Sequence, residues 1–290
     1  MKGYVSFPAP VAEDKVRGKP EKFSDHYSQA RLFYRSQTQV EKNHIIAAFR
    51  FELTRVQTEA VRERIVSMLV NVDADLAQGV ADGLGIPVPP AQPTVLDVIP
   101  ESEVAASPAL SLMFRPGDGS IRGRRVALLV AEGADGPSLR ATHAALLKAE
   151  AVPRFVGIRL GAVAVDGGNP IHAEVTLETA PSVVWDASVL PAGEAAVAKL
   201  LAVGQTAEFI KDQYRHCKTI LVLGDSTALL DAANVKPQLP DGSADPGIFI
   251  CPPPDKTDPA LRTDADTVAA FIAGIAKHRH FEREMDPPPV

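Results

Sequence analysis

The residues best placed to do chemistry lie at the turn Gly224-Asp225-Ser226, within the stretch KTILVLGDSTALL. The apolar run before the turn, residues 219–223, has the composition of a buried strand, and a helix-forming run follows at once. A strand, a tight turn and a helix in this order form a nucleophile elbow, which presents one side chain at the carboxyl edge of a parallel sheet. This turn has no cysteine, and its one hydroxyl, on Ser226, lies past the position that an elbow exposes. The sequence therefore predicts the architecture of an active site without its nucleophile.

Two other sets of residues could supply a nucleophile. Ser226, Asp225 and a histidine distant in sequence would make a catalytic triad, although such sets arise often by chance. Cys217 comes just before the predicted strand, so it lies at the opposite edge of the sheet, roughly 20 Å from the turn at ~3.3 Å per residue. Cys251 ends a later strand nearer the carboxyl edge, but no motif supplies it with a base. We expect both cysteines to be reduced, in the core or at strand ends, because two cysteines make neither a disulfide framework nor a tetrahedral metal site.

Nucleotide chemistry is not indicated at the other turn that follows an apolar run. Residues 132–136, EGADG, lack the G-x-G-x-x-G spacing of a dinucleotide site and the Lys-Ser/Thr of a phosphate-binding loop. We therefore expect no cofactor to bind this chain, and no metal.

Charge and hydropathy exclude two further classes of partner. Residues 1–86 carry 12 Lys and Arg against 11 Asp and Glu, a balance of +1, so the net charge of −6 leaves −7 on the remainder. Neither part is basic enough for nucleic acid. Mean hydropathy is +0.01, and no apolar run approaches the ~20 residues that span a bilayer. The start, MKGYVSFPAP, has no apolar region of a secretory signal, so a cytoplasmic protein without membrane contact is expected.

The first third of the chain predicts a small all-α unit behind an extended arm. Residues 1–23 alternate Pro, Gly and charge without a helical period, which is typical of an arm that wraps on another body. Residues 24–86 are predicted to be helical, and Thr38 with Glu41 has the spacing of a capping box. Further helix boundaries are expected at Thr58, at Asp73, and at Gly83 or Gly85. This unit has too little apolar partner surface of its own and should dock on another body.

The rest of the chain predicts a linker and an α/β domain. Residues 87–122 are rich in proline and read as a semi-rigid linker, residues 123–282 as the domain, and residues 283–290 as a tail. Strands alternate with helices, which predicts a parallel sheet covered on both faces. Strands are expected at 125–131, 154–159, 185–190, 219–223 and 247–250, a hairpin at 163–165 with 171–175, and helices at 137–149, 194–201, 205–215 and 263–280. In the last helix, Thr263 is the expected cap, and Lys277, His278 and His280 suit the negative end.

Residues 3–86 resemble the end of the wrapping segment and the C-terminal helices of haem-containing monofunctional catalases. The resemblance rests on DHYSQARLFYRS and on the helix EKNHIIAAFRFEL that follows it. It implies haem and hydrogen peroxide dismutation in the full-length family, with the haem pocket in a β-barrel core that nothing here matches. No catalytic or haem-binding residue is therefore carried over. His26, His44, Tyr27 and Tyr34 lie within the matching helices, away from the pocket motifs, and we expect them to serve packing and surface hydrogen bonds.

Residues 123–281 are similar to the flavodoxin-like domain that ends large-subunit catalases, which resembles the class I glutamine amidotransferase-like superfamily with its PfpI-type peptidases. The PfpI-like pattern has Cys-His at the elbow and a Glu after the first strand, which helps to activate the thiol. Here Gly224 stands at the Cys and Asp225 at the His, and Ser138 or Asp135 stands at the Glu. The resemblance implies a doubly wound flavodoxin-like sheet with a vacant catalytic site.

Three functions follow from these two resemblances. The first is the non-haem C-terminal part of a large-subunit catalase, which docks on the haem core and on like subunits of a homotetramer and stabilises them. The second is a chaperone-like role that binds unfolded proteins through exposed apolar helix faces. The third is a cryptic PfpI-like hydrolase or deglycase built on the elbow.

Overall fold

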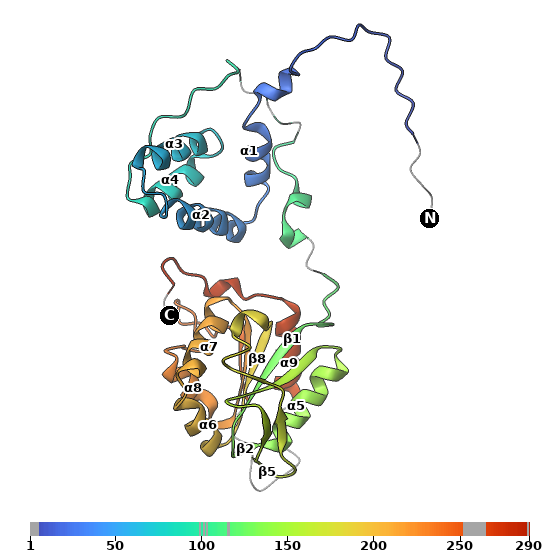
Figure 1. The fold of residues 1–290 in the computed structure, drawn as a ribbon, viewed down its shortest axis with the longest axis vertical. Coiled ribbons are helices and arrows are strands. Elements are labelled where there is room, and N and C mark those ends of the chain that lie inside the picture. The colour runs from blue at the N-terminus through green and yellow to red at the C-terminus, as the bar shows by residue number, and fades with distance from the viewer. Residues whose placement is uncertain are drawn as a thin grey trace. The chain divides into compact units, whose positions relative to one another are not determined.

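The computed structural model describes residues 6–98, 100, 102, 104–114, 117–251, 265–288 and 290. The chain divides into two compact units, Met1–Arg115 and Pro116–Val290. Figure 1 shows a helical first unit and an α/β second unit.

The described residues of the first unit form four α-helices, α1 (Ser28–Arg35), α2 (Gln39–Leu53), α3 (Glu59–Val70) and α4 (Ala74–Leu84), after a 3-10 turn η1 (Glu21–Ser24). The predicted capping box is confirmed, because Thr38 accepts from the Glu41 amide and the Glu41 carboxylate accepts from the Thr38 amide at 2.8 Å. Helix α4 starts after Asp73, whose side chain caps it, and ends at Gly85 in the left-handed conformation (φ 66°). The buried core of this unit joins residues of α1 to α4, among them Tyr34, Leu53, Val66, Leu76 and Val80.

The proline-rich stretch lies along these helices. The hydroxyl of Ser67 in α3 donates to the carbonyl of Pro90 at 2.6 Å, and the amide of Gln92 donates to the carbonyl of Ser67 at 3.0 Å. Two short turns follow, η2 (Pro108–Leu110) and η3 (Leu112–Phe114). Burial alone would raise the pKa of the Glu41 carboxyl, but hydrogen bonds from Thr38, Ser111 and Leu112 lower it to about 2. Glu41 thus joins the start of α2 to this stretch.

Among the described residues, a parallel six-stranded sheet forms the middle of the second unit, which confirms the predicted parallel sheet and adds one strand, β7, to the five that were expected. Its order is β10-β9-β8-β1-β3-β7, and every adjacent pair runs parallel. The five longer strands, β1, β3, β8, β9 and β10, counted in chain order, read 2-1-3-4-5, which is the flavodoxin-like order. The strands are β1 (Arg125–Val130), β3 (Val152–Gly157), β7 (Val175–Thr176), β8 (Ala187–Leu190), β9 (Thr219–Leu223) and β10 (Ile248–Cys251).

Helices cover both faces of this sheet. Figure 1 shows α5 (Gly136–Lys148) and α9 (Ala265–Ala276) on one face, and α6 (Glu194–Leu201), α7 (Gly204–Arg215) and α8 (Thr227–Ala232) on the other. Strand β9 is buried along its whole length because it lies between β8 and β10 with helices on either side. The core is therefore centred on the strand that leads to the predicted elbow.

The predicted hairpin is more divided than the sequence indicated. Strands β4 (Gly161–Val163) and β6 (Ile171–Ala173) pair antiparallel, but β5 (Val165–Asp166) pairs with β2 (Ala134–Asp135), and β7 joins the main sheet. The predicted hairpin is divided because Ala164 and Glu174, which lie between these short strands, hydrogen-bond to other parts of the unit. The carbonyl of Ala164 accepts from the amide of Gly133 at 3.0 Å, and the amide of Glu174 donates to Phe155 at 3.0 Å, so each run changes its partner there.

The C-terminal end also differs from the prediction. Helix α9 ends at Ala276 and not at His280, because His278 adopts a left-handed conformation (φ 71°) that no helix continues. His278 and His280 therefore do not extend the helix, and the expected cap at Thr263 lies outside the described residues. A short turn, η7 (Phe281–Arg283), follows, and Arg283, predicted as the first residue of the tail, is buried with 2% of its surface exposed.

Candidate functional site

The predicted strand–turn–helix is confirmed at the carboxyl edge of the sheet. Strand β9 leads into a 3-10 turn η5 (Gly224–Ser226), and α8 follows directly. Gly224 is buried and has φ 55°, in the left-handed region where a side chain is unfavourable. The position at which the PfpI-like pattern has its cysteine is therefore a glycine in a conformation that favours glycine. It has no side chain that could act as a nucleophile.

The hydroxyl of Ser226 is not presented to a substrate. Ser226 is fully buried, and its hydroxyl donates to the carbonyl of Pro191 in the loop after β8. Asp225 is exposed to solvent. Within the described residues, no hydrogen bond joins either side chain to a histidine. The geometry thus uses Ser226 to attach the turn to the neighbouring loop.

The two residues that stand at the position of the activating Glu lie at the start of helix α5 and hydrogen-bond to each other. Asp135 precedes α5, and its carboxylate accepts from the Ser138 amide at 3.2 Å. The Ser138 hydroxyl donates to the Asp135 carbonyl at 3.0 Å. The amide of Asp135 donates to Ala192 at 2.8 Å, next to the Pro191 that holds Ser226. Asp135 and Ser226 therefore both hydrogen-bond to the loop that follows β8. In these contacts they hold the backbone in place.

The loops that follow β1 and β8 lie against each other at the carboxyl edge of the sheet. In a sheet of this order, ligands bind where β1 and β8 diverge, outside the carboxyl ends of the strands. Here the loops after β1 and β8 contact each other: a Cβ built on Gly193 (φ 114°) would overlap the carbonyl oxygen of Gly133. The same loops are joined by the hydrogen bond from Asp135 to Ala192. These two contacts hold the loops after β1 and β8 together at the edge of the sheet where this fold type binds ligands.

We expect Ser226→Ala to reduce stability without removing an activity. The substitution leaves the buried Pro191 carbonyl without its donor, which costs about 1–2 kcal/mol of unfolding free energy. Denaturant unfolding measures this loss, and the exposed Thr227→Ala provides a control expected to stay within about 0.5 kcal/mol. An esterase or peptidase activity of the chain that disappears in Ser226→Ala would contradict this assignment.

Neither cysteine is placed as a nucleophile. Cys251 is buried at the end of β10, in register with Leu223 of β9, and so lies beside the elbow strand. Cys217 is buried at the opposite, amino edge of the sheet, as predicted. Burial first, and then the nearby Glu284 carboxylate, raise the pKa of the Cys217 thiol to about 12, so it stays protonated at neutral pH.

A buried group of ionisable residues at the amino edge was not predicted from the sequence. Its members, here called the amino-edge cluster, are Lys218, Asp245, His280 and Arg283, each no more than 4% exposed. The Arg283 guanidinium binds both carboxylate oxygens of Asp245, with Nε at 2.7 Å from Oδ2 and Nη2 at 2.8 Å from Oδ1. Its Nη1 donates to the Lys218 carbonyl at 2.6 Å. These residues are distant in sequence and form no motif, so no local pattern could have revealed them.

The cluster holds the C-terminal segment against the sheet. The His280 amide donates to the Cys217 carbonyl at 2.8 Å, and its Nε2 shares a hydrogen bond of 3.1 Å with the Thr219 hydroxyl. Burial, and then the Arg283 charge, lower the pKa of His280 to about 4. Burial and the Arg279 charge lower the pKa of Lys218 to about 8, and its ammonium donates to the Ser182 carbonyl at 2.6 Å. Each of these contacts attaches one segment of the α/β unit to another.

The four histidine and tyrosine side chains considered as haem ligands lie in the packed core or at the surface of the helical unit. Tyr34 is buried in its core under the Lys42 ammonium, which lies 5.3 Å from the ring centroid, and burial raises the pKa of Tyr34, which disfavours the phenolate. His26 and His44 are exposed. The cavity beside His26 and Tyr27 has a volume of about 10 Å³, far below that of a porphyrin. These four side chains therefore do not form a haem pocket.

The described part of the chain contains no group of three or more His, Cys, Asp or Glu placed to hold a metal ion. None of its helices combines the length and the apolar character needed to cross a membrane.

Comparison with known proteins matches both units. A family model described as "Catalase-related immune-responsive" matches residues 20–84, and one described as "C-terminal domain found in long catalases" matches residues 122–285. Catalase C of Rhizobium meliloti is 36% identical over 284 residues, which are 98% of this chain and 38% of that protein. Catalase HPII of Pseudomonas putida is 35% identical, over 97% of this chain and 36% of that protein. Catalase-1 of Neurospora crassa is 31% identical, over 98% of this chain and 39% of that protein. The chain thus spans less than two fifths of the length of these relatives.

Proposed function

Because this chain belongs to the family of C-terminal domains found in long catalases, we propose that it serves hydrogen peroxide detoxification as a non-catalytic part of such an enzyme. The observation that carries this proposal is the elbow: Gly224 stands where a nucleophile would be, and Ser226 is buried against Pro191. The order of the two family matches supports it, since the helices precede the α/β domain. Its role is to stabilise the haem core and to join subunits of a homotetramer.

The helical unit supplies the surface for docking on the haem core. Phe33 of α1 is 48% exposed and Phe51 of α2 is 58% exposed, and the arm before α1 exposes Phe7 at 89%. Large aromatic side chains gain ~1.5–3 kcal/mol each when they are fully buried, so a partner that covers them is stabilised. The same exposed side chains favour a second candidate, a holdase that binds unfolded proteins.

Co-expression with a haem core tests the docking role. The partner is Catalase C of Rhizobium meliloti shortened by the segment that this chain matches. We expect the 290-residue chain to elute with this core and to prolong its peroxide dismutation at raised temperature, while the chain alone with added haem evolves no oxygen. Phe51→Ser should weaken co-elution, whereas Leu160→Ser, an exposed leucine of the α/β unit, should not.

Three results would count against docking. Oxygen evolution by the chain alone would show that it carries the reaction. Separate elution of chain and core, with unchanged thermal inactivation, would remove the stabilising role. If the chain instead keeps a heat-denatured unrelated enzyme in solution at equimolar ratio, the holdase function takes first place.

A further inference from the structure

A short turn at the end of the helical unit exposes its large apolar side chains. It is formed by η2 and η3, residues 108–114, and is called here the apolar turn. Leu112 is 81% exposed and Phe114 is 62% exposed, and Leu110 and Met113 follow at 41% and 39%. Single exposed apolar residues are common on protein surfaces, but four in one short segment mark an interaction site.

Two side chains near the start of α2 hold the backbone of this turn. The Glu41 carboxylate accepts from the Leu112 amide and from the Ser111 hydroxyl, each at 2.8 Å, and the Gln37 side-chain amide donates to the Leu110 carbonyl at 3.3 Å. Burial alone would raise the pKa of Glu41, but the hydrogen bonds lower it to about 2, so the carboxylate is charged at neutral pH and its bonds are strengthened. Polar contacts thus hold the turn in one conformation while its apolar side chains remain exposed.

This combination suits an anchor for a protein partner. Exposed large apolar side chains gain free energy when a partner buries them. A segment whose backbone is already fixed loses less conformational entropy on binding than a flexible segment does. The matching partner is therefore a surface with an apolar groove that receives Leu112 and Phe114.

The length of the relatives indicates which partner this is. Residues 122–285 match a domain described as C-terminal in long catalases, and the chain spans 36% to 39% of the three relatives named above. More than three fifths of such a protein therefore precede the matching segment. In a long catalase that part is covalently joined to the helical unit, and its high effective concentration favours it over other partners.

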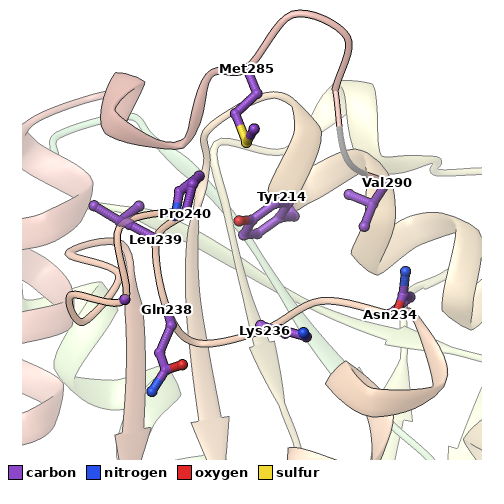
Figure 2. Close-up of a pocket in the computed structure, with 9 residues that line it drawn as sticks. Tyr214, Asn234, Lys236, Gln238, Leu239, Pro240, Met285 and Val290 are labelled. Atoms are coloured by element: carbon purple, nitrogen blue, oxygen red, sulfur yellow. The ribbon is translucent and has the colours of Figure 1, made fainter.

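The cavity of the α/β unit suits the apolar turn less well. Its volume is about 420 Å³, and it lies between α7, the loop that follows α8 and the C-terminal segment. Figure 2 shows Lys236, Gln238 and Asn234 along one side of it, opposite Met285. An apolar side chain inserted there would remove water from an ammonium and two amides without giving them a partner. Binding of the turn to this cavity in a second copy is therefore disfavoured.

We propose that the apolar turn anchors the helical unit by inserting Leu112 and Phe114 into an apolar groove on the part of a long catalase that precedes the matching segment. The inference rests on the docking function proposed above and names the residues that carry it. Glu41 acts as a positioning residue, because it holds the turn and is not itself part of the apolar contact.

Co-purification with a haem core tests the inference. The core is Catalase C of Rhizobium meliloti shortened by the segment that this chain matches, and the haem absorbance that elutes with the tagged 290-residue chain measures the complex. We expect Leu112→Ser and Phe114→Ser each to weaken the complex at least about tenfold, because each removes one buried apolar side chain. Leu160→Ser, at a leucine of the α/β unit that is 67% exposed, should leave the complex unchanged.

A second pair of variants tests whether the fixed conformation of the turn matters. Glu41→Ala removes the acceptor for Leu112 and Ser111, and we expect it to weaken the complex about tenfold although Leu112 and Phe114 are still present. Thr38→Ala removes the other side chain of the same capping box but leaves the bonds from the turn to Glu41, so it should bind like the parent chain. Circular dichroism of each variant shows whether the helices are folded.

The outcomes separate this inference from the proposed function. If the parent chain binds the core and Leu112→Ser and Phe114→Ser bind it equally well, docking stands but the apolar turn is not its anchor. If the parent chain binds no core, docking and its anchor are both overturned. The inference is also overturned if the two variants convert a dimer of the parent chain into a monomer, or if they destabilise the chain alone. The partner is then a second copy in the first case and the chain itself in the second.

Discussion

Replacing Arg283 with alanine is expected to lower the free energy of unfolding of the α/β unit by about 3–5 kcal/mol. The substitution leaves the Asp245 carboxylate buried, with 0% of its side chain exposed, without the guanidinium that binds both of its oxygens. It also removes the donor to the Lys218 carbonyl and the cation over the Tyr214 ring. Urea unfolding at pH 7, followed by tryptophan fluorescence of Trp185, which is buried in this unit, measures the loss.

Two controls distinguish the cost of leaving the Asp245 carboxylate buried without a partner from the cost of removing any arginine. Arg124→Ala breaks a partly exposed pair with Asp186 (3.4 Å), and we expect it to cost no more than about 1 kcal/mol. Arg283→Met combined with Asp245→Leu removes both charges, and it should regain part of the stability that Arg283→Ala loses. A loss below 1 kcal/mol in Arg283→Ala would mean that Asp245 is solvated and that the cluster does not hold the C-terminal segment.

The sheet could be predicted because its strands are continuous apolar runs. A strand buried on both faces needs no alternation of polar residues, so RVALLV at β1 and TILVL at β9 stand out from the helices between them. The start of α2 was equally clear, since Thr38 and Glu41 act within one turn of chain. In each case the interactions that decide the structure lie close together in sequence.

The contacts that sequence could not predict join distant residues. Asp245 and Arg283 are 38 positions apart, and each alone reads as a solvated charge in a loop or a tail. The division of the predicted hairpin has the same origin, because Ala164 and Glu174 pair with Gly133 and Phe155 of other elements. Short strands have no pattern of their own that selects one partner over another.

The candidate site was predicted in position but not in its environment. Residues 219–226 alone indicate an elbow with glycine at its tip. They do not indicate that the Ser226 hydroxyl donates to Pro191, or that Asp135 and Ser138 cap α5, because the partners of these side chains depend on the tertiary fold. The residue type alone predicts that position 224 has no nucleophile. The hydrogen bonds that Ser226, Asp135 and Ser138 make could be learned only from the structure.

The amino-edge cluster should make this chain sensitive to acid through His280. Its pKa is lowered to about 4 by burial and by the Arg283 charge, against about 6.5 in an unfolded chain. The unfolded state therefore binds a proton more tightly, so the stability from neutral His280 is present above pH 6.5 and is lost as the pH falls toward 4. The slope approaches about 1.4 kcal/mol per pH unit, so the α/β unit should lose about 2 kcal/mol between pH 7 and pH 5 from this residue alone.

Comparison with His280→Gln isolates this effect from the other groups that titrate in the same range. The pKa values of His143, His216 and His278 are also lowered, chiefly by burial, so the parent chain loses some stability in acid without His280. Glutamine keeps a polar group for the Thr219 hydroxyl but cannot take up a proton, and the backbone bond to Cys217 remains. We expect His280→Gln to be less stable than the parent at pH 7 but to lose about 2 kcal/mol less between pH 7 and pH 5. Parallel losses in the two proteins, measured by urea unfolding at each pH, would mean that His280 is protonated in the folded state. The segment 277–284 would then reach solvent, contrary to the burial that the cluster requires.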